Sequence, residues 1–129
     1  MHAPGMAQLI RFEAAGSPCG RFDRVHLYQI LANLIGNATR YCSGAAGSVS
    51  LSVRGIDERR VLISVQDDGP GIVAEDRAKV FEPFFTSDPK GTGLGLFMAR
   101  ELAEANGAEL SLVDAAGGAE FHLMVRRTA

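Results

Sequence analysis

The sequence predicts an α+β fold, in which a mixed, mostly antiparallel sheet forms one layer of a two-layer α/β sandwich and helices cover one face. Two observations favour it: pairs of alternating apolar segments are joined by short turns, and two other segments carry apolar residues at helical spacing. Their order is strand, helix, two strands, long loop, helix, two strands. With 129 residues, of which 47% are hydrophobic, we expect a single domain over residues 1–129 with an ordered core at about 8–126.

Five segments in which apolar and polar residues alternate are predicted to be strands. The first is an edge strand, because its alternation is partial and Gly16-Ser17-Pro18 breaks it. The other four form two hairpins, because glycine-containing turns at residues 55–59 and 115–118 separate them. The predicted strands are Gln8–Ala14, Val49–Arg54, Val61–Gln66, Glu109–Val113 and Ala119–Val125.

Two segments are predicted to be helices. Asp23 can accept a hydrogen bond from a free backbone N–H and so cap the first helix, which runs to about Tyr41. The second runs from Gly93 to Asn106 and ends at Gly107, because glycine readily takes the left-handed conformation found at helix ends. The apolar stripe of the first helix consists of Leu27, Ile30, Leu31, Leu34, Ile35 and Ala38.

Residues 67–92, between the second predicted hairpin strand and the second helix, have no clear periodicity and are rich in Gly, Pro, Asp and Phe. A long loop inside a compact domain is usually a lid or a binding loop, and we expect Val73–Lys90 to be a lid. The three phenylalanines of Phe81-Glu82-Pro83-Phe84-Phe85 are expected to anchor this lid on the core rather than to contact a ligand.

Composition excludes several classes of function. The net charge is -2 and no basic stretch is present, so nucleic acid is not an expected partner. No apolar run is long enough to cross a bilayer, so this domain is not expected to insert into a membrane. Cys19 and Cys42 have no metal-like spacing; two reduced thiols in a cytoplasmic chain are the favoured interpretation, and a disulfide is the alternative.

The first predicted helix carries an unusual polar face opposite its apolar stripe. Gln29, Asn33, Gly36, Asn37 and Arg40 fall on one narrow side at helical spacing. A carboxamide oxygen can ligate Mg²⁺ and an arginine can bind phosphate. Taken alone, the stripe is more typical of an ordinary solvated helix face than of a binding site.

Two glycine motifs flank the predicted lid. Asp67-Asp68-Gly69-Pro70-Gly71-Ile72 follows a strand, where glycines let a ligand approach the backbone and a carboxylate can accept a hydrogen bond from an amine. Lys90-Gly91-Thr92-Gly93-Leu94-Gly95-Leu96 opens the second helix, whose free amides and dipole favour phosphate. It matches neither a P-loop nor a dinucleotide fingerprint. Taken alone, the first motif is more typical of a plain Asp-Gly turn than of a ligand site.

In this order and spacing, four motifs resemble the ATPase superfamily that includes histidine kinases, gyrase, heat-shock chaperones and mismatch-repair proteins. Asn33–Ala38 resembles its N box, Asp67–Gly71 its G1 box, Phe81–Phe85 its F box and Gly91–Leu96 its G2 box. The resemblance covers nearly all of residues 8–126 and implies the Bergerat-type ATP-binding fold. The runs FEPFFTSDPKGTGLGL and ARELAEANGAEL look like those of nitrogen-regulation and pilus-sensor histidine kinases.

The resemblance implies ATP and Mg²⁺ as cofactors and assigns roles to individual residues. Asn37 would ligate a Mg²⁺ that bridges the ATP phosphates, Arg40 would lie near the phosphates, and Tyr41 near the ribose or base. Asp67 would accept a hydrogen bond from the adenine amine, and Lys90 would reach the γ-phosphate when the lid closes. The other positions implied for nucleotide binding are Gly69, Gly71, Ile72, Gly91, Thr92, Gly93, Leu94, Gly95 and Leu96.

One position distinguishes kinases from hydrolases in this superfamily. The hydrolases have a glutamate four residues before the metal-binding asparagine, and it activates water; here that position is Asn33. A carboxamide is a very poor general base, although it can hold a water on the metal. The implied catalytic residues, Asn33, Asn37 and Arg40, therefore suit phosphoryl transfer rather than hydrolysis.

The chain contains no residue that fits the phosphoacceptor of the kinase family, a histidine followed by an acidic residue and soon after by proline. His2, His26 and His122 all lack this context. The expected function is thus the ATP-binding catalytic domain of a two-component sensor histidine kinase, cut from a longer sensor, which delivers the γ-phosphoryl group to a histidine on a separate dimerisation domain.

The resemblance also implies partners. They are the histidine-bearing dimerisation domain of the same sensor and, downstream, a response regulator. The isolated domain is expected to be monomeric and unable to autophosphorylate alone. Two alternatives remain at this stage: a stand-alone anti-sigma-type protein-serine kinase, and a nucleotide-binding pseudokinase module.

Overall fold

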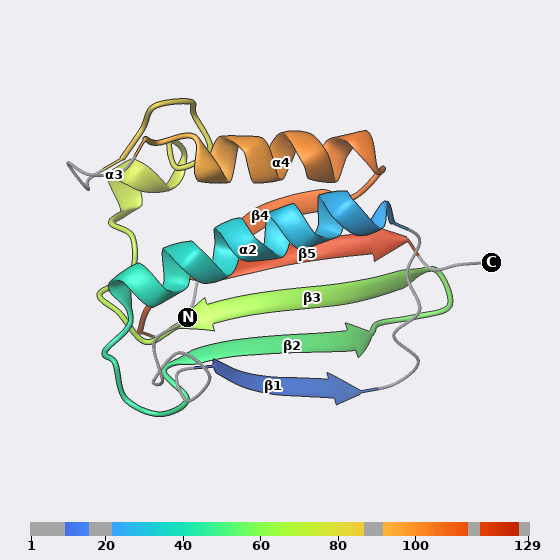
Figure 1. The fold of residues 1–129 in the computed structure, drawn as a ribbon, viewed down its shortest axis with the longest axis horizontal. Coiled ribbons are helices and arrows are strands. Elements are labelled where there is room, and N and C mark those ends of the chain that lie inside the picture. The colour runs from blue at the N-terminus through green and yellow to red at the C-terminus, as the bar shows by residue number, and fades with distance from the viewer. Residues whose placement is uncertain (1–9, 16–21, 87–91, 114–116, 127–129) are drawn as a thin grey trace.

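A computed structural model describes residues 10–15, 22–86, 92–113 and 117–126. It has two layers, a sheet and a pair of helices that cover one of its faces (Figure 1). The elements are β1 (Ile10–Ala15), α2 (Arg24–Tyr41), β2 (Val49–Gly55), β3 (Arg60–Asp67), α3 (Ala74–Arg77), α4 (Gly95–Ala105), β4 (Glu109–Val113) and β5 (Glu120–Arg126). The predicted fold class is confirmed.

The five strands form one mixed sheet with the order β1-β2-β3-β5-β4. The edge strand β1 pairs with β2 in parallel, and every other pair is antiparallel. Both predicted hairpin pairings are present, β2 with β3 and β4 with β5. The sheet is therefore mostly antiparallel, as the sequence predicts.

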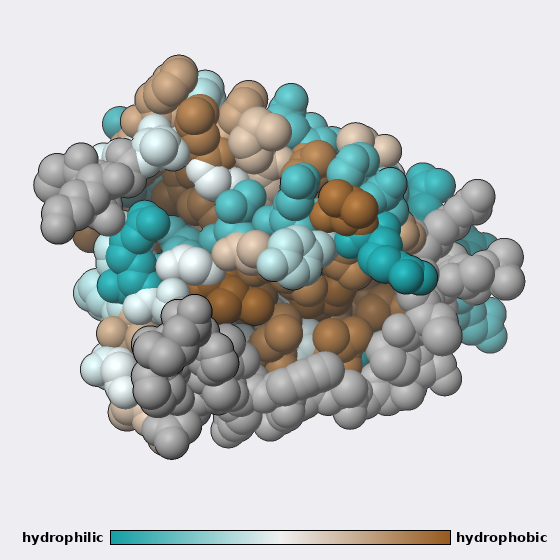
Figure 2. Space-filling view, viewed as in Figure 1, coloured by the Kyte–Doolittle hydropathy of each residue, from teal (hydrophilic) through white to brown (hydrophobic). Residues whose placement is uncertain are grey.

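The core lies between the central strands and the two long helices. On β3, Val61 and Val65 are almost fully buried, and they pair with Val125 and Phe121 on β5. Successive side chains of a strand point to opposite faces, so this alternation places the apolar set of both strands under the helices. Figure 2 shows apolar residues concentrated between α2 and the strands below it.

Helix α2 forms where the sequence predicts it. The Asp23 carboxylate accepts a hydrogen bond from the His26 N–H at 3.0 Å and caps the first turn. The helix buries Ile30, Leu34 and Ala38 against the sheet. Because the buried stripe fixes the rotation of the helix about its axis, the opposite polar face turns toward the end of β3 and the start of α4.

The structure differs from the sequence predictions at the second helix and in the long loop before it. Helix α4 begins at Gly95 rather than Gly93, because Gly93 has a φ of 74° and cannot belong to a right-handed helix. The predicted long loop contains a short helix, α3, which the lack of periodicity did not reveal. Residues 8–9 of the first predicted strand and 115–116 of the last predicted turn lie outside the described residues.

Asn106 joins the two long helices at the end remote from the glycine motifs. Its Oδ1 accepts a hydrogen bond from the Asp23 N–H at 2.9 Å, and its Nδ2 donates to the Leu102 carbonyl at 2.8 Å. Nδ2 also lies 2.9 Å from Nδ1 of His26. One carboxamide thus ties the first turn of α2 to the last turn of α4.

Asn106→Ala is expected to lower the free energy of unfolding by about 1–3 kcal/mol, because it removes this tie and leaves partly buried polar groups without partners. Urea denaturation measures the change. Glu101→Ala, an exposed position on the same helix, is the control and should change stability by no more than about 0.5 kcal/mol. Equal losses in the two variants would show that Asn106 does not join the helices.

Candidate functional site

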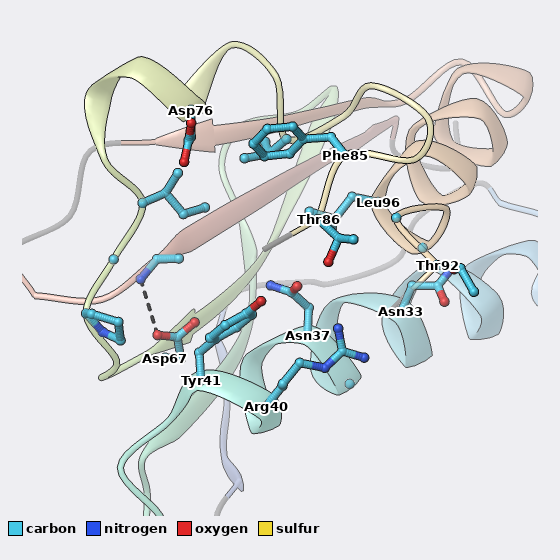
Figure 3. A pocket seen from close by; sticks show the side chains of 18 of the residues that line it. Asn33, Asn37, Arg40, Tyr41, Asp67, Asp76, Phe85, Thr86, Thr92 and Leu96 are labelled. Atoms are coloured by element: carbon cyan, nitrogen blue, oxygen red, sulfur yellow. Dashed lines mark hydrogen bonds between the residues drawn. The ribbon is translucent and has the colours of Figure 1, made fainter. Parts of the chain in front are cut away.

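The glycine motifs and the polar face of α2 surround one cavity of about 450 Å³. This volume is typical of a site for a small molecule. Figure 3 shows the cavity running from Asp67 and Asp76 at one end to Asn33 and Thr92 at the other. The lining residues are Ala32, Asn33, Gly36, Asn37, Arg40, Tyr41, Asp67, Pro70, Gly71, Ile72, Val73, Asp76, Val80, Phe85, Thr86, Thr92, Gly93, Gly95, Leu96 and Ala119.

Asp67, the last residue of β3, is only 4% exposed although it is charged. Its Oδ1 accepts hydrogen bonds from the Gly69 N–H at 2.8 Å and from the Ala119 N–H at 3.3 Å, the latter drawn in Figure 3. None of the described residues donates to Oδ2. The two backbone donors hold the carboxylate in one orientation, so its second oxygen is available to a ligand that donates a hydrogen bond.

The neighbouring Asp68 has a different role. Its carboxylate accepts hydrogen bonds from the Ser43 hydroxyl at 2.6 Å and the Ser43 N–H at 2.7 Å. These two donors hold the pKa of Asp68 below its usual range, the hydroxyl contributing most. Asp68 is exposed and does not line the cavity. It ties the turn after β3 to the loop after α2.

Glycines form the wall behind Asp67. Gly118 has a φ of 93°, and a Cβ there would lie 1.9 Å from the Asp67 carbonyl oxygen. Gly71 has a φ of 79° and approaches Gly118 in turn. A Cβ at Gly69 would lie 2.2 Å from the Tyr41 carbonyl oxygen. Gly69 therefore serves close packing of the turn on the end of α2 and is not among the residues that line the cavity. Its implied role in making room for the base stays a prediction.

Six residues of α2 line the cavity, four of them from the predicted polar stripe. The stripe residues are Asn33, Gly36, Asn37 and Arg40, and Ala32 and Tyr41 lie beside them. Figure 3 shows Tyr41 beside Asp67, with Asn37 and Arg40 further along and Asn33 at the far end. Gln29 belongs to the same predicted stripe but does not line the cavity, because it lies one turn closer to the start of the helix. Most of the stripe therefore lines the cavity, and its first residue, Gln29, is exposed to solvent.

The start of α4 closes the far end. Gly95 and Leu96 line the cavity in the first turn, where backbone N–H groups have no partner within the helix. Before them, the Leu94 N–H bonds to the Thr92 hydroxyl at 3.2 Å, and Leu94 itself does not line the cavity. A free helix N-terminus of this kind attracts anions.

The phenylalanines of the predicted lid have three different environments. Phe81 packs edge-on against Phe121 with ring centroids 5.9 Å apart, so it anchors the segment as predicted. Phe85 packs on the core and also lines the cavity. Phe84 is 73% exposed, so the expectation that it anchors the lid is wrong. Its N–H instead donates to the Gly93 carbonyl at 2.8 Å, which joins this part of the segment to the residues just before α4.

Most residues named from the sequence meet at this cavity. Lys90 and Gly91 lie outside the described residues. Several lining residues were not predicted from the sequence. Two of them had a signal: Ala119 directly follows the predicted turn, and Asp76 lies four residues after Ile72, the spacing of one helical turn. The missed lining residues are Ala32, Pro70, Val73, Asp76, Val80, Phe85, Thr86 and Ala119.

In the part of the chain that the structure describes, no group of three or more His, Cys, Asp and Glu side chains could hold a metal ion. Cys42 is a free thiol, and Cys19 lies outside that part. None of the helices described here is long and apolar enough to cross a bilayer.

Comparison with known proteins shows which family has this arrangement. Residues 22–129 match the model of the histidine kinase-, DNA gyrase B- and HSP90-like ATPase family. The sensor protein kinase PilS of Pseudomonas aeruginosa is 44% identical over 74% of this chain and 19% of its own length. The sensor histidine kinase ZraS of Klebsiella oxytoca is 37% identical over 77% of this chain and 21% of its own length. The chain thus spans about a fifth of these two relatives.

Solved structures agree. The catalytic domain of the histidine kinase ThkA, in a nucleotide-free form, superposes with a TM-score of 0.81 at 28% identity and covers 95% of this chain and 84% of its own. Full-length ShkA in complex with AMPPNP gives 0.78 at 37% identity, over 97% of this chain and 27% of its own. The resemblance found in the sequence is confirmed: this chain belongs to the histidine kinase-, DNA gyrase B- and HSP90-like ATPase family, and within it to the ATP-binding catalytic domains of sensor histidine kinases.

Proposed function

We propose that this chain binds Mg-ATP in the cavity and delivers its γ-phosphoryl group to a histidine on a separate dimerisation domain of the same sensor, which then supplies a response regulator. The observation that carries this proposal is the polarity of the cavity. One end has a buried carboxylate with an open oxygen, and the other has Arg40 and a free helix N-terminus.

The base of ATP fits the end that Asp67 forms. Oδ2 of Asp67 would accept one N–H of the adenine amine, because Oδ1 is already engaged by two backbone donors. Ile72 and Val80 supply apolar wall at this end, and Gly71 leaves room beside them. The oxygen of this nearly buried carboxylate that has no donor among the described residues would thereby gain one.

The phosphates fit the opposite end. Thr92, Gly93, Gly95 and Leu96 bring the start of α4 to the cavity, and Arg40 enters from α2. Backbone N–H groups and a guanidinium are both well suited to phosphate oxygens. Lys90 is proposed to join them when the lid closes.

The donor set suits a single Mg²⁺ that a phosphate chain helps to hold. Asn37 offers a carboxamide oxygen, and the described residues provide no acidic cluster that would hold the ion alone. Mg²⁺ commonly binds one or two protein oxygens together with phosphates and water. When bound, Mg²⁺ would neutralise negative charge on the transferred γ-phosphoryl group and on the ADP that leaves.

Transfer rather than hydrolysis is proposed because Asn33 lines the cavity where a water-activating base would be required. Its carboxamide cannot accept a proton at neutral pH. The residues of this chain would then act by binding and orienting ATP, and Asn33 would position a water on the metal. We place this reaction in the cytoplasm, where ATP is available.

Asn37→Ala is expected to abolish the gain in ATP affinity that Mg²⁺ provides, a loss of about tenfold or more, because even groups that only position a metal ligand contribute this much. Isothermal titration with and without Mg²⁺ measures it. Gln29→Ala is the matched control, since it removes a carboxamide from the same face of α2 outside the cavity. Unchanged Mg-ATP binding in Asn37→Ala would remove the metal role.

The transfer step is tested by adding Mg-ATP and a separate helical dimerisation domain with its phosphoacceptor histidine. Phosphohistidine is labile in acid, whereas phosphoserine is stable. Acid-labile label on the added domain is the expected result. Acid-stable label on a serine substrate would favour the protein-serine kinase alternative, and ATP binding without any transfer would favour the pseudokinase alternative.

A further inference from the structure

Asp76, in the first turn of α3, is the second carboxylate that lines the cavity. Figure 3 shows it on the wall across from Asp67, at the same end of the cavity, with its carboxylate directed inward. The side chain is partly buried. No described residue donates a hydrogen bond to its carboxylate or forms an ion pair with it.

Local structure does not account for this position. Acidic residues in a first turn stabilise a helix through its dipole, but α3 has only four residues, and the exposed Glu75 already supplies a charge in that turn. A carboxylate that faces a cavity gives up part of its hydration. The cost is recovered when a ligand donates to it.

We propose that Asp76 is a specificity-determining residue for the base, an inference that rests on the proposed binding of ATP. The exocyclic amine of adenine has two N–H bonds. Asp67 accepts one through Oδ2, and Asp76, from the opposite wall, accepts the other. Guanine presents a carbonyl oxygen at that position, which would face two carboxylates and gain a hydrogen bond from neither.

The same two carboxylates also determine the orientation of the bound nucleotide. They make the base end of the cavity anionic, while Arg40 and the start of α4 make the other end attractive to anions. A triphosphate is repelled from the end that holds Asp67 and Asp76. The charge pattern therefore selects one orientation of an elongated, asymmetric ligand.

The test compares two ligands and two variants in the complete chain. The ligands are ATP and purine riboside 5′-triphosphate, which carries hydrogen in place of the amine. The variants are Asp76→Ala and the control Glu75→Ala, which removes an equal charge from the same turn at an exposed position outside the cavity. Circular dichroism and thermal melting establish that each variant is folded.

Asp76→Ala is expected to weaken ATP binding by about threefold to tenfold, the net value of one typical hydrogen bond, because solvent at this partly exposed site weakens the contribution of the charge. Binding of purine riboside triphosphate should stay unchanged, and Glu75→Ala should leave both ligands unaffected. Equal losses for both ligands would overturn the proposal in favour of a structural role. Equal losses in the two variants would overturn it in favour of a general charge effect, and undiminished ATP binding in Asp76→Ala would remove the contact.

Failure of the proposed function gives a different result. In that case the wild-type chain would not bind ATP at all, whereas failure of the Asp76 inference leaves wild-type ATP binding intact.

Discussion

Asp67→Asn is expected to weaken ATP binding by about one to two decades and to remove most of the discrimination against GTP. The remaining side-chain oxygen can still accept the N–H groups of Gly69 and Ala119, so the turn keeps its hydrogen bonds. The new amide then places N–H donors where Oδ2 was. The N–H groups of this amide and of the adenine amine would then face each other with no acceptor between them. An unpaired buried polar group costs about 1–3 kcal/mol. The guanine carbonyl, in contrast, becomes an acceptable partner.

Competition titrations with ATP and GTP measure this change directly. Asp68→Asn is the matched control, because it alters the adjacent carboxylate, which is exposed and bound to Ser43 outside the cavity. It should leave the ratio of ATP to GTP affinity unchanged. If Asp67→Asn folds normally and also keeps the wild-type ratio, Asp67 shapes the turn only and selectivity arises from the form of the cavity.

Gly118→Ala is expected to lower the free energy of unfolding by about 2–5 kcal/mol and to weaken ATP binding at the same time. Its left-handed φ of 93° costs any other residue about 1–2 kcal/mol. The new Cβ would also lie 1.9 Å from the Asp67 carbonyl oxygen and 3.1 Å from its Oδ1, so the end of β3 must move. Such overpacking adds about 1–3 kcal/mol and displaces the carboxylate that we propose reads the base.

Gly117→Ala is a close control for this effect. Gly117 has a φ of 78°, but a Cβ there meets nothing within 4 Å. The free energy of unfolding of this variant should fall by only about 1–2 kcal/mol, from backbone strain, and the variant should bind ATP as the wild type does. Urea denaturation and calorimetry on both variants separate backbone strain from displacement of Asp67. Identical stability and affinity in the two would show that the contact with Asp67 has no consequence.

Local patterns in the sequence determined a large part of the fold. The spacing of Ile30, Leu34 and Ala38 identified α2 and its buried face, and its opposite face then had to carry Asn33 and Asn37. Period-2 alternation identified the four paired strands in the same way. These features depend on neighbours one turn or two residues apart, which is the range over which a sequence pattern carries information.

The part of the site between Asp67 and Leu96 was harder to predict from the sequence. The motifs indicated a nucleotide, but α3 is four residues long and too short to show periodicity. Phe81, Phe84 and Phe85 have the same chemistry, and only packing distinguishes an anchor, an exposed ring and a wall of the cavity. Composition alone could not assign these three environments.

The sequence by itself determined the fold class, the polar face of α2 and the ends of the cavity, because each rests on local spacing. Tertiary structure decided how Asp67 is held, since Ala119 and Gly118 reach it only when β5 pairs with β3. It also brought Asp76 to the same end of the cavity. Contacts between residues far apart in the chain follow from how whole elements pack, and no short sequence pattern specifies them.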